Sequence, residues 1–404
     1  MVLGETTGRA GGFFGWKVVW AAFLVAVFGW GVGFYGPSVF LRTLHADKGW
    51  AISEISAAIT THFLLSAVLV VYLPEAYRRF GLARVTQAGI AFAILGMLAW
   101  ANAQRPWQLF PAALLSGIGW AATSGAAINA IVAPWFDKDR PKALSLAFNG
   151  ASIGGLVFTP LWVALIGAFG FATAAIMVGI AMGIVLLPVS ERLLRPQPAG
   201  GTAAPARTAL PLDRRALLRD RRFVTISAAF ALGLFAQIGL FAHLLTRLTP
   251  VFGPEGAAWA ISLATICAVA GRTILGWILG ENNRRLAAAG NFVVQACGTA
   301  LLMVASGMPL LLLGCILFGL GVGNLVSLPP LILQKEFPAG DVGGAVALTV
   351  AINQAVFAFA PAVLGLLRGI AGDYTIAFGV VAAVQLIAGL IVIAYRAKSD
   401  VTAA

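Results

Sequence analysis

Charged residues are scarce in this sequence. Of its 404 residues only 10% are Asp, Glu, Lys or Arg, whereas 60% are hydrophobic and the mean hydropathy is +0.92. Soluble domains carry about 25% charged residues, so this composition excludes a soluble globular protein. The apolar runs are about twenty residues or longer, the length that crosses a bilayer as a helix. Short strands of alternating polarity are absent, so the predicted fold class is an all-α membrane protein.

Residues that build catalytic or metal centres are equally rare. The three histidines have no spacing that brings two of them to one metal ion, and the three cysteines lie inside apolar runs, which excludes an extracellular disulfide framework. No nucleophile with a paired base and no G-x-x-x-x-G-K-[ST] phosphate loop occurs. We therefore predict no enzyme, no cofactor and no metal site. The residues concerned are His45, His62, His243, Cys267, Cys297 and Cys315.

Twelve hydrophobic segments can be counted along the chain. The first follows Lys17 without a signal-peptide cleavage site, so it is interpreted as a retained span. A connection rich in Pro, Gly, Ala and Arg predicts an N-terminal six-helix half at 1–190, a basic cytoplasmic linker at 191–221 and a C-terminal six-helix half at 222–404. The segments are 16–41, 52–73, 84–103, 107–135, 143–168, 171–190, 222–248, 256–279, 286–306, 308–334, 343–367 and 374–396.

The net charge of +12 reflects topology rather than a nucleic-acid partner. Of the 27 Lys and Arg, 21 lie in the two termini and in alternate connections that share one side. Because cytoplasmic connections carry the excess of Lys and Arg, we predict that both termini and the linker are cytoplasmic, in a bacterial inner membrane. The opposite side holds Arg42, Lys48, Arg105, Arg247 and Arg368. The remaining basic residue, Arg272, lies inside a span and belongs to neither side.

Two stretches of the chain match at an offset of 201 residues. "WFDKDRPKALSLAFNGASIGGLVFTP", from Trp135 to Pro160, aligns with "EFPAGDVGGAVALTVAINQAVFAFAP", from Glu336 to Pro361. An internal repeat of two membrane halves is typical of transporters whose substrate site lies between the repeats near the midplane.

The repeated stretch, together with "GWKVVWAAFLVAVFGWGVGFYGPSVFL", "GLFAHLLTRLTPVFG" and "AGRTILGWILG", resembles the major facilitator superfamily along nearly the whole chain. In detail it resembles the bacterial monocarboxylate porters and oxalate/formate exchangers. The resemblance implies twelve transmembrane helices in two six-helix halves related by a pseudo-two-fold axis, and transport by alternating access.

The loop between spans 2 and 3 departs from the family pattern G-x-L-x-D-R-x-G-x-R. This chain reads "PEAYRRFGLAR", with Arg78 where the aspartate stands, while Arg79, Gly81 and Arg84 match. The resemblance implies a latch between the halves at these residues. We expect Glu75, one turn earlier, to supply the missing carboxylate.

Arg272 lies about sixteen residues into span 8, roughly 24 Å from its outer end at 1.5 Å per residue. No Asp or Glu lies at mid-depth in any predicted span, and a buried cation is costly without an anion. Arg272 either extends toward the cytoplasmic end or binds the carboxylate of a substrate, and the second interpretation is favoured. In monocarboxylate porters the corresponding arginine resembles a substrate ligand with an aspartate one turn earlier, where this chain has Ala268.

The remaining candidates are polar residues inside the spans. His62 is a candidate for proton coupling, with a packing role as the alternative, because histidine titrates near working pH. Thr123 and Asn324 are equivalent in the repeat, which predicts a pair facing one cavity. About half of the amides and hydroxyls are expected to line that cavity and the rest to bond neighbouring helices. The predicted substrate ligands besides Arg272 are Tyr35, Thr123, Asn149, Gln237, Asn324 and Asn353.

The leading functional hypothesis is a monomeric secondary or facilitative transporter of a small organic anion. A single deep cation suits a monocarboxylate, with protons or a counter-anion as coupling partners. Export of an amphipathic drug or metabolite is the alternative. A membrane enzyme or receptor scaffold is disfavoured because the spans hold no catalytic or metal-binding set.

Overall fold

A computed structural model describes residues 13–196, 213–279 and 282–395, and every regular element in these ranges is a helix. Twelve stretches are long and apolar enough to span a membrane, which confirms the predicted all-α fold with twelve spans. The first part of the chain forms α1 (Phe14–Gly29), η1 (Trp30–Phe34), α2 (Gly36–Lys48), α3 (Ile52–Val70), α4 (Leu73–Phe80), α5 (Leu82–Asn102), η2 (Pro106–Gln108), α6 (Leu109–Thr123), α7 (Gly125–Val132), η3 (Ala133–Trp135), α8 (Arg140–Phe169) and α9 (Phe171–Leu193). The second part forms α10 (Arg214–Arg219), α11 (Arg221–Ile278), α12 (Arg284–Val304), α13 (Met308–Val322), α14 (Asn324–Glu336), α15 (Ala339–Phe357), α16 (Ala360–Ala371) and α17 (Thr375–Ile393).

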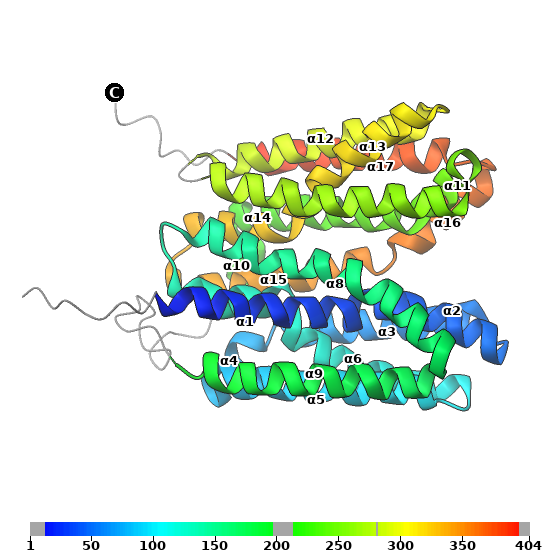
Figure 1. Cartoon of the computed structure of the whole chain (residues 1–404). Coiled ribbons are helices and arrows are strands. Elements are labelled where there is room, and N and C mark those ends of the chain that lie inside the picture. The colour runs from blue at the N-terminus through cyan, green and yellow to red at the C-terminus, as the bar shows by residue number, and fades with distance from the viewer. Residues whose placement is uncertain (1–12, 197–212, 280–281, 396–404) are drawn as a thin grey trace, which may run out of the picture.

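The helices form two bodies that lie side by side (Figure 1). In the first body α5 packs against α6 and α9, and α1 packs against α8. In the second body α12 packs against α13 and α17, and α11 packs against α13. The largest contacts between the bodies are those of α8 with α11 and of α3 with α15.

Several spans are broken near their middle. Span 1 changes from α-helix to the π-helix η1 before α2, where Pro37 lacks the N–H that continues an α-helical ladder. Span 4 is divided at Ser124, and span 10 is divided at Gly323 between α13 and α14. Ser124 and Gly323 lie at nearly equivalent positions of the 201-residue repeat. The breaks therefore support a duplicated origin of the two halves.

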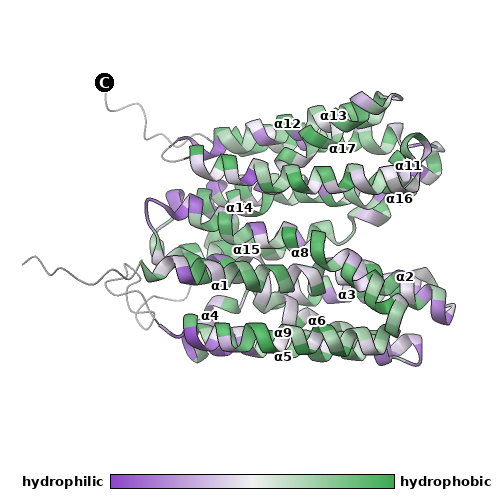
Figure 2. Cartoon of the chain, in the orientation of Figure 1, coloured by the Kyte–Doolittle hydropathy of each residue, from purple (hydrophilic) through white to green (hydrophobic). Residues whose placement is uncertain are grey.

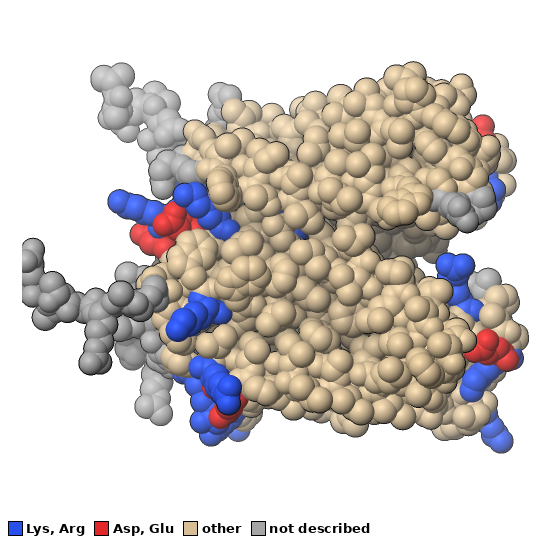
Figure 3. Space-filling view, viewed as in Figure 1, with Lys and Arg blue, Asp and Glu red and all other residues tan. Residues whose placement is uncertain are grey.

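The surface has the polarity of a membrane protein. Hydrophobic residues predominate along the visible helices and hydrophilic ones gather near their ends (Figure 2), and on the visible face Lys and Arg gather at the two ends of the molecule (Figure 3). Phe14 at the start of α1 and Ile393 at the end of α17 lie at the same end, as an even number of spans requires (Figure 1). We call this end the terminal end. That the terminal end faces the cytoplasm stays a prediction. The domain boundaries also stay a prediction, because residues 197–212 of the linker lie outside the described residues.

The two bodies are in contact toward the terminal end and apart at the opposite end. Near the terminal end Gln334 Nε2 of α14 donates to Asn129 Oδ1 of α7 over 2.9 Å. At the opposite end α2 packs mainly on α3 and α8 of its own body, and α16 packs on α11 and α17. Figure 3 shows a hollow between the bodies there.

The close packing of α1 on α8 depends on glycine. A methyl group at Gly150 would lie against the carbonyl oxygen of Phe23, whereas one at Gly167, on the same helix, would meet no atom within 4 Å. We expect Gly150→Ala to lower the free energy of unfolding by about 1–3 kcal/mol because rigid backbone must move apart. The measurement is the thermal midpoint of the purified protein. Gly167→Ala is the matched control, and equal midpoints for both variants would contradict the packing described.

Candidate functional site

Arg272 lies in the second span of α11, at the boundary between the two bodies, and only 3% of it is exposed. Its Nε donates to the carbonyl oxygen of Gly323 over 2.8 Å. Its Nη1 donates to the carbonyl oxygen of Phe148 over 2.5 Å and to Asn149 Oδ1 over 3.1 Å. Each of these acceptors is neutral, and no carboxylate of the described residues forms an ion pair with the guanidinium. The cation is hydrogen-bonded but its charge is not compensated.

The acceptors of Arg272 are available because span 10 is broken at Gly323 and because α8 is held against α11 by further hydrogen bonds. Gly323 stands at the break of span 10, and a methyl group there would lie 2.8 Å from Arg272 Nε. Ser145 and Asn149, one turn apart on α8, bond back to α11: Ser145 Oγ donates to Arg272 O over 2.8 Å, and Asn149 Nδ2 donates to Thr273 Oγ1 over 2.8 Å. Asn149 therefore lies beside Arg272. It belongs to the first body and Arg272 to the second.

Tyr35 is brought to the same region by the π-helical turn that precedes it. Its ring packs on Gly155 of α8, where a methyl group would lie 2.5 Å from the ring. Its hydroxyl is close enough to Arg272 for an electrostatic interaction. Asn149 and Arg272 thus form one polar group that includes residues from both bodies, with Tyr35 in the same region.

Three other predicted ligands lie in separate networks. Gln237 Oε1 accepts from Gln295 Nε2 over 2.9 Å, and Asn324 Nδ2 donates to Asn291 Oδ1 over 2.8 Å, both inside the second body. Thr123 Oγ1 donates to Gly119 O over 3.0 Å inside the first body. The expected pair of Thr123 and Asn324 is not brought together by these hydrogen bonds.

The amides of α15 connect the bodies a second time. Gln354 Oε1 accepts from Trp120 Nε1 of α6 over 2.9 Å. Asn353 and Gln354 are both buried, and among the described residues no partner is found for Asn353 Oδ1 or Gln354 Nε2. Buried polar atoms without a partner are uncommon, so each of them calls for an explanation.

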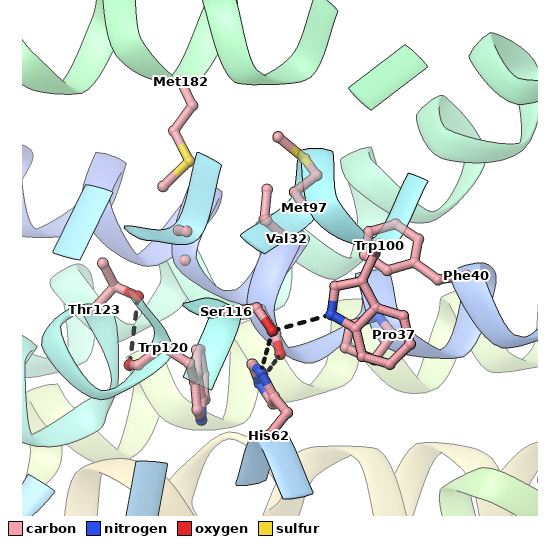
Figure 4. A pocket seen from close by; sticks show the side chains of 13 residues that line it. Val32, Pro37, Phe40, His62, Met97, Trp100, Ser116, Trp120, Thr123 and Met182 are labelled. Atoms are coloured by element: carbon pink, nitrogen blue, oxygen red, sulfur yellow. Dashed lines mark hydrogen bonds between the residues drawn. The ribbon is translucent and has the colours of Figure 1, made fainter. Parts of the chain in front are cut away.

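His62 lies in a closed network of the first body (Figure 4). Its Nε2 donates to Gly33 O over 3.0 Å, and its Nδ1 is 2.9 Å from Ser116 Oγ, which also accepts from Trp100 Nε1 over 3.1 Å. The residue four positions after Gly33 is Pro37, so no backbone N–H can take the Gly33 carbonyl in an α-helical bond. These residues line a cavity of about 10 Å³, roughly the space of one water molecule.

The loop between spans 2 and 3 contacts the linker helix. Glu75 Oε1 accepts from Arg214 Nη2 of α10 over 2.6 Å, and the guanidinium of Arg214 lies over the ring of Tyr72. Arg79 and Arg84 are exposed, and Gly81 has a φ of +86°, which favours glycine at this turn. The expected latch between the halves stays a prediction, and Glu75 is placed to join α4 to α10.

Sequence reasoning missed a group of aromatic residues near Arg272. Trp30, Phe34 and Trp120 belong to the first body and Phe357 to the second, and their rings lie 4.9–6.1 Å apart in successive pairs. The i, i+4 spacing of Trp30 and Phe34 places them on one helix face and could have pointed to it. The contact with Phe357 depends on tertiary structure and has no local signal.

Comparison with known proteins agrees with this architecture. The profile of the Major Facilitator Superfamily matches residues 19–348. The chain belongs to this superfamily. Among its relatives, human monocarboxylate transporter 11 is 26% identical over 93% of this chain and 81% of its own length. Rat monocarboxylate transporter 13 is 26% identical over 76% of this chain and 71% of its own length. MFS-type transporter 1 of Ophiocordyceps is 28% identical over 82% of this chain and 74% of its own length.

Solved structures of two superfamily transporters share the fold. The human organic anion transporter MFSD10 (TETRAN) superimposes with a TM-score of 0.70 at 14% identity, covering 94% of this chain and 99% of its own. A variant of the Escherichia coli fucose:proton symporter, FucP, gives 0.71 at 14% identity over 94% and 100%. This chain is therefore a membrane transporter and not an enzyme, with relatives in the monocarboxylate branch.

The contact of α8 with α11 predicts how the closed end can be opened. A methyl group at Gly276 would lie 2.6 Å from Ser145 Cβ in the other body. We expect Gly276→Val to shift the population toward a state that is open at the terminal end, because the two helices can no longer approach.

The measurement is the electron–electron distance between spin labels at exposed Arg195 and Asn282, in a variant without native cysteines. The distance should lengthen in Gly276→Val. It should stay unchanged in the control Gly290→Val, since position 290 has open space around it. Identical distances in all three proteins would contradict the prediction.

Proposed function

We propose that this protein is a secondary transporter of a small monocarboxylate that works by alternating access and binds the substrate carboxylate with Arg272. The observation that carries the proposal is the buried guanidinium at the boundary of the two bodies, which has only neutral acceptors among the described residues. Desolvation makes such a cation a strong binding site for an anion. The similarity to monocarboxylate transporters supports the same substrate class.

A carboxylate competes well for this guanidinium. The fork of two N–H groups fits the two oxygens of one carboxylate, and a carboxylate supplies the opposite charge that the present neutral acceptors lack. One cation neutralises one negative charge, so a monoanion is favoured over a dianion. The hydroxyl of Tyr35 is proposed as a further donor to the substrate.

Binding is proposed to release one body from the other. Phe148 O and Asn149 Oδ1 belong to the first body, and Arg272 belongs to the second. A substrate that takes the guanidinium removes both of these contacts between the bodies. The substrate then stabilises the state in which they separate, and this differential affinity is what a transport cycle requires. We further propose that the protein acts as a monomer, with its terminal end in the bacterial cytoplasm.

Substrate uptake into proteoliposomes tests the role of Arg272. We expect Arg272→Ala to abolish saturable uptake of radiolabelled monocarboxylates such as pyruvate. Arg272→Lys should reduce uptake by about tenfold or more because an ammonium lacks the planar fork. Arg247→Ala is the matched control, since Arg247 lies near the end opposite the termini and donates to Ala305 O over 2.6 Å. Saturable uptake that survives in Arg272→Ala would overturn the proposal.

His62 is the proposed proton-coupling residue. Ser116 can donate to a neutral His62 Nδ1, or turn its hydroxyl to Ala113 O, 3.3 Å away, and accept from a protonated one. We expect His62→Gln to lose accumulation driven by a pH gradient and to keep substrate exchange, because glutamine can replace both hydrogen bonds but cannot carry the proton. The assay compares both modes in the same liposomes. Accumulation that still follows the pH gradient would assign His62 a packing role.

A further inference from the structure

A layer of aromatic rings fills the boundary between the two bodies next to Arg272. We define the aromatic cluster as Trp30, Phe34, Phe63, Trp120 and Phe357. Centroid distances are 4.9 Å for Trp30–Trp120, 6.0 Å for Phe34–Trp120, 6.0 Å for Phe34–Phe63, 6.1 Å for Phe34–Phe357 and 5.7 Å for Phe63–Phe357. Phe357 alone comes from the second body. When the bodies move apart, its contacts with Phe34 and Phe63 must break.

The cluster is continuous with the polar group around Arg272. The ring of Phe148 lies 6.4 Å from that of Trp30, and the carbonyl oxygen of Phe148 accepts from Arg272. On the same side, Tyr35 follows Phe34 directly and contacts its ring at 5.1 Å. A molecule that bound Arg272 with one end would therefore meet aromatic rings with its other end.

A donor also lies at the edge of the cluster. Gln354 is 2% exposed, and its Oε1 is occupied by Trp120 Nε1. Its Nε2 has no partner among the described residues. Leaving a buried amide donor unpaired costs free energy, which a ligand oxygen at this position would recover.

We propose that the substrate is a monocarboxylate with an aromatic body, of the arylacetate or arylpyruvate class. This inference rests on the proposed function, because the carboxylate is held by Arg272. The ring of the substrate inserts beside Trp30, Phe34, Trp120 and Phe357, where it replaces the contacts that are lost when the bodies separate. Gln354 Nε2 donates to an oxygen on the body of the substrate, such as the keto oxygen of an arylpyruvate.

Short aliphatic acids gain little binding free energy from this surface. A methyl group of acetate or pyruvate covers little of five rings, whereas an aryl group forms edge-to-face and stacked contacts with several of them. Each aromatic pair contributes binding free energy beyond the burial of apolar surface, and together these contributions correspond to about tenfold or more in affinity. The described structure therefore favours aryl acids over short aliphatic acids.

The test is equilibrium binding to the full chain in lipid nanodiscs. The probes are phenylpyruvate, phenylacetate, pyruvate, acetate and the uncharged phenylacetamide, and their binding is measured by calorimetry. We expect phenylacetate to bind about tenfold or more tighter than acetate, and phenylacetamide to show no binding that depends on Arg272.

Two variants test where the aryl ring of the substrate lies and whether Gln354 donates to the substrate. Phe357→Leu should reduce the ratio of the phenylacetate to acetate affinities, while Phe359→Leu, an exposed neighbour outside the cluster, should leave it unchanged. Gln354→Leu should weaken phenylpyruvate and leave phenylacetate unaffected. Each ratio is taken within one variant, so it does not depend on the fraction of protein that is folded.

The outcomes separate the two proposals. Acetate or pyruvate that binds through Arg272 as tightly as the aryl acids overturns the aromatic substrate and leaves monocarboxylate transport standing. Tight binding of phenylacetamide, equal to that of phenylacetate, overturns the role of the carboxylate. Failure of all acids to bind overturns the proposed function itself.

Discussion

The structure depends on one constraint, a guanidinium that is buried in a membrane-spanning helix and cannot lose its charge. Arg272 must donate its N–H groups, and the chain supplies acceptors by breaking span 10 at Gly323 and by bringing the carbonyl of Phe148 and the amide of Asn149 from the other body. These acceptors take the N–H groups of Nε and Nη1, but all of them are neutral and leave the positive charge without a partner among the described residues. The contact between the bodies at this point is therefore made by the group with the greatest affinity for an anion.

Interrupted helices also provide backbone acceptors for other buried polar side chains. In span 1 Pro37 removes a backbone donor, and the carbonyl of Gly33 is taken by His62 instead; the carbonyl of Gly31 accepts from Trp162 over 3.2 Å. Polar side chains thus find partners inside the bilayer without a neighbouring carboxylate. The same breaks leave spans 1, 4 and 10 built from segments that can move relative to each other.

Much of the fold could be predicted from the sequence, because the length of each hydrophobic segment and the 201-residue repeat can be read directly from the order of the residues. Arg272 could be identified for the same reason, since a single charge stands out in an apolar run. The structure also brings the predicted ligand Asn149 beside it. The networks of Gln237 and Asn324, in contrast, depend on which helix face meets Gln295 and Asn291, and the contact of Phe34 with Phe357 joins residues far apart in the chain. No periodicity in the sequence encodes these pairings.

The missing acid at Ala268 changes the charge balance of a transport cycle. A site with a paired aspartate is neutral when empty, and it must gain a proton to accept an anion without excess charge. In the proposed cycle the empty site of this chain carries one positive charge, and its complex with a monocarboxylate is neutral. Moving a net charge through a medium of low dielectric is costly, so the loaded protein reorients more easily than the empty one. The empty protein is also held by the bonds from Arg272 to Phe148 and Asn149, which the substrate removes. In the proposed cycle both effects act in the same direction and ease the reorientation of the loaded protein.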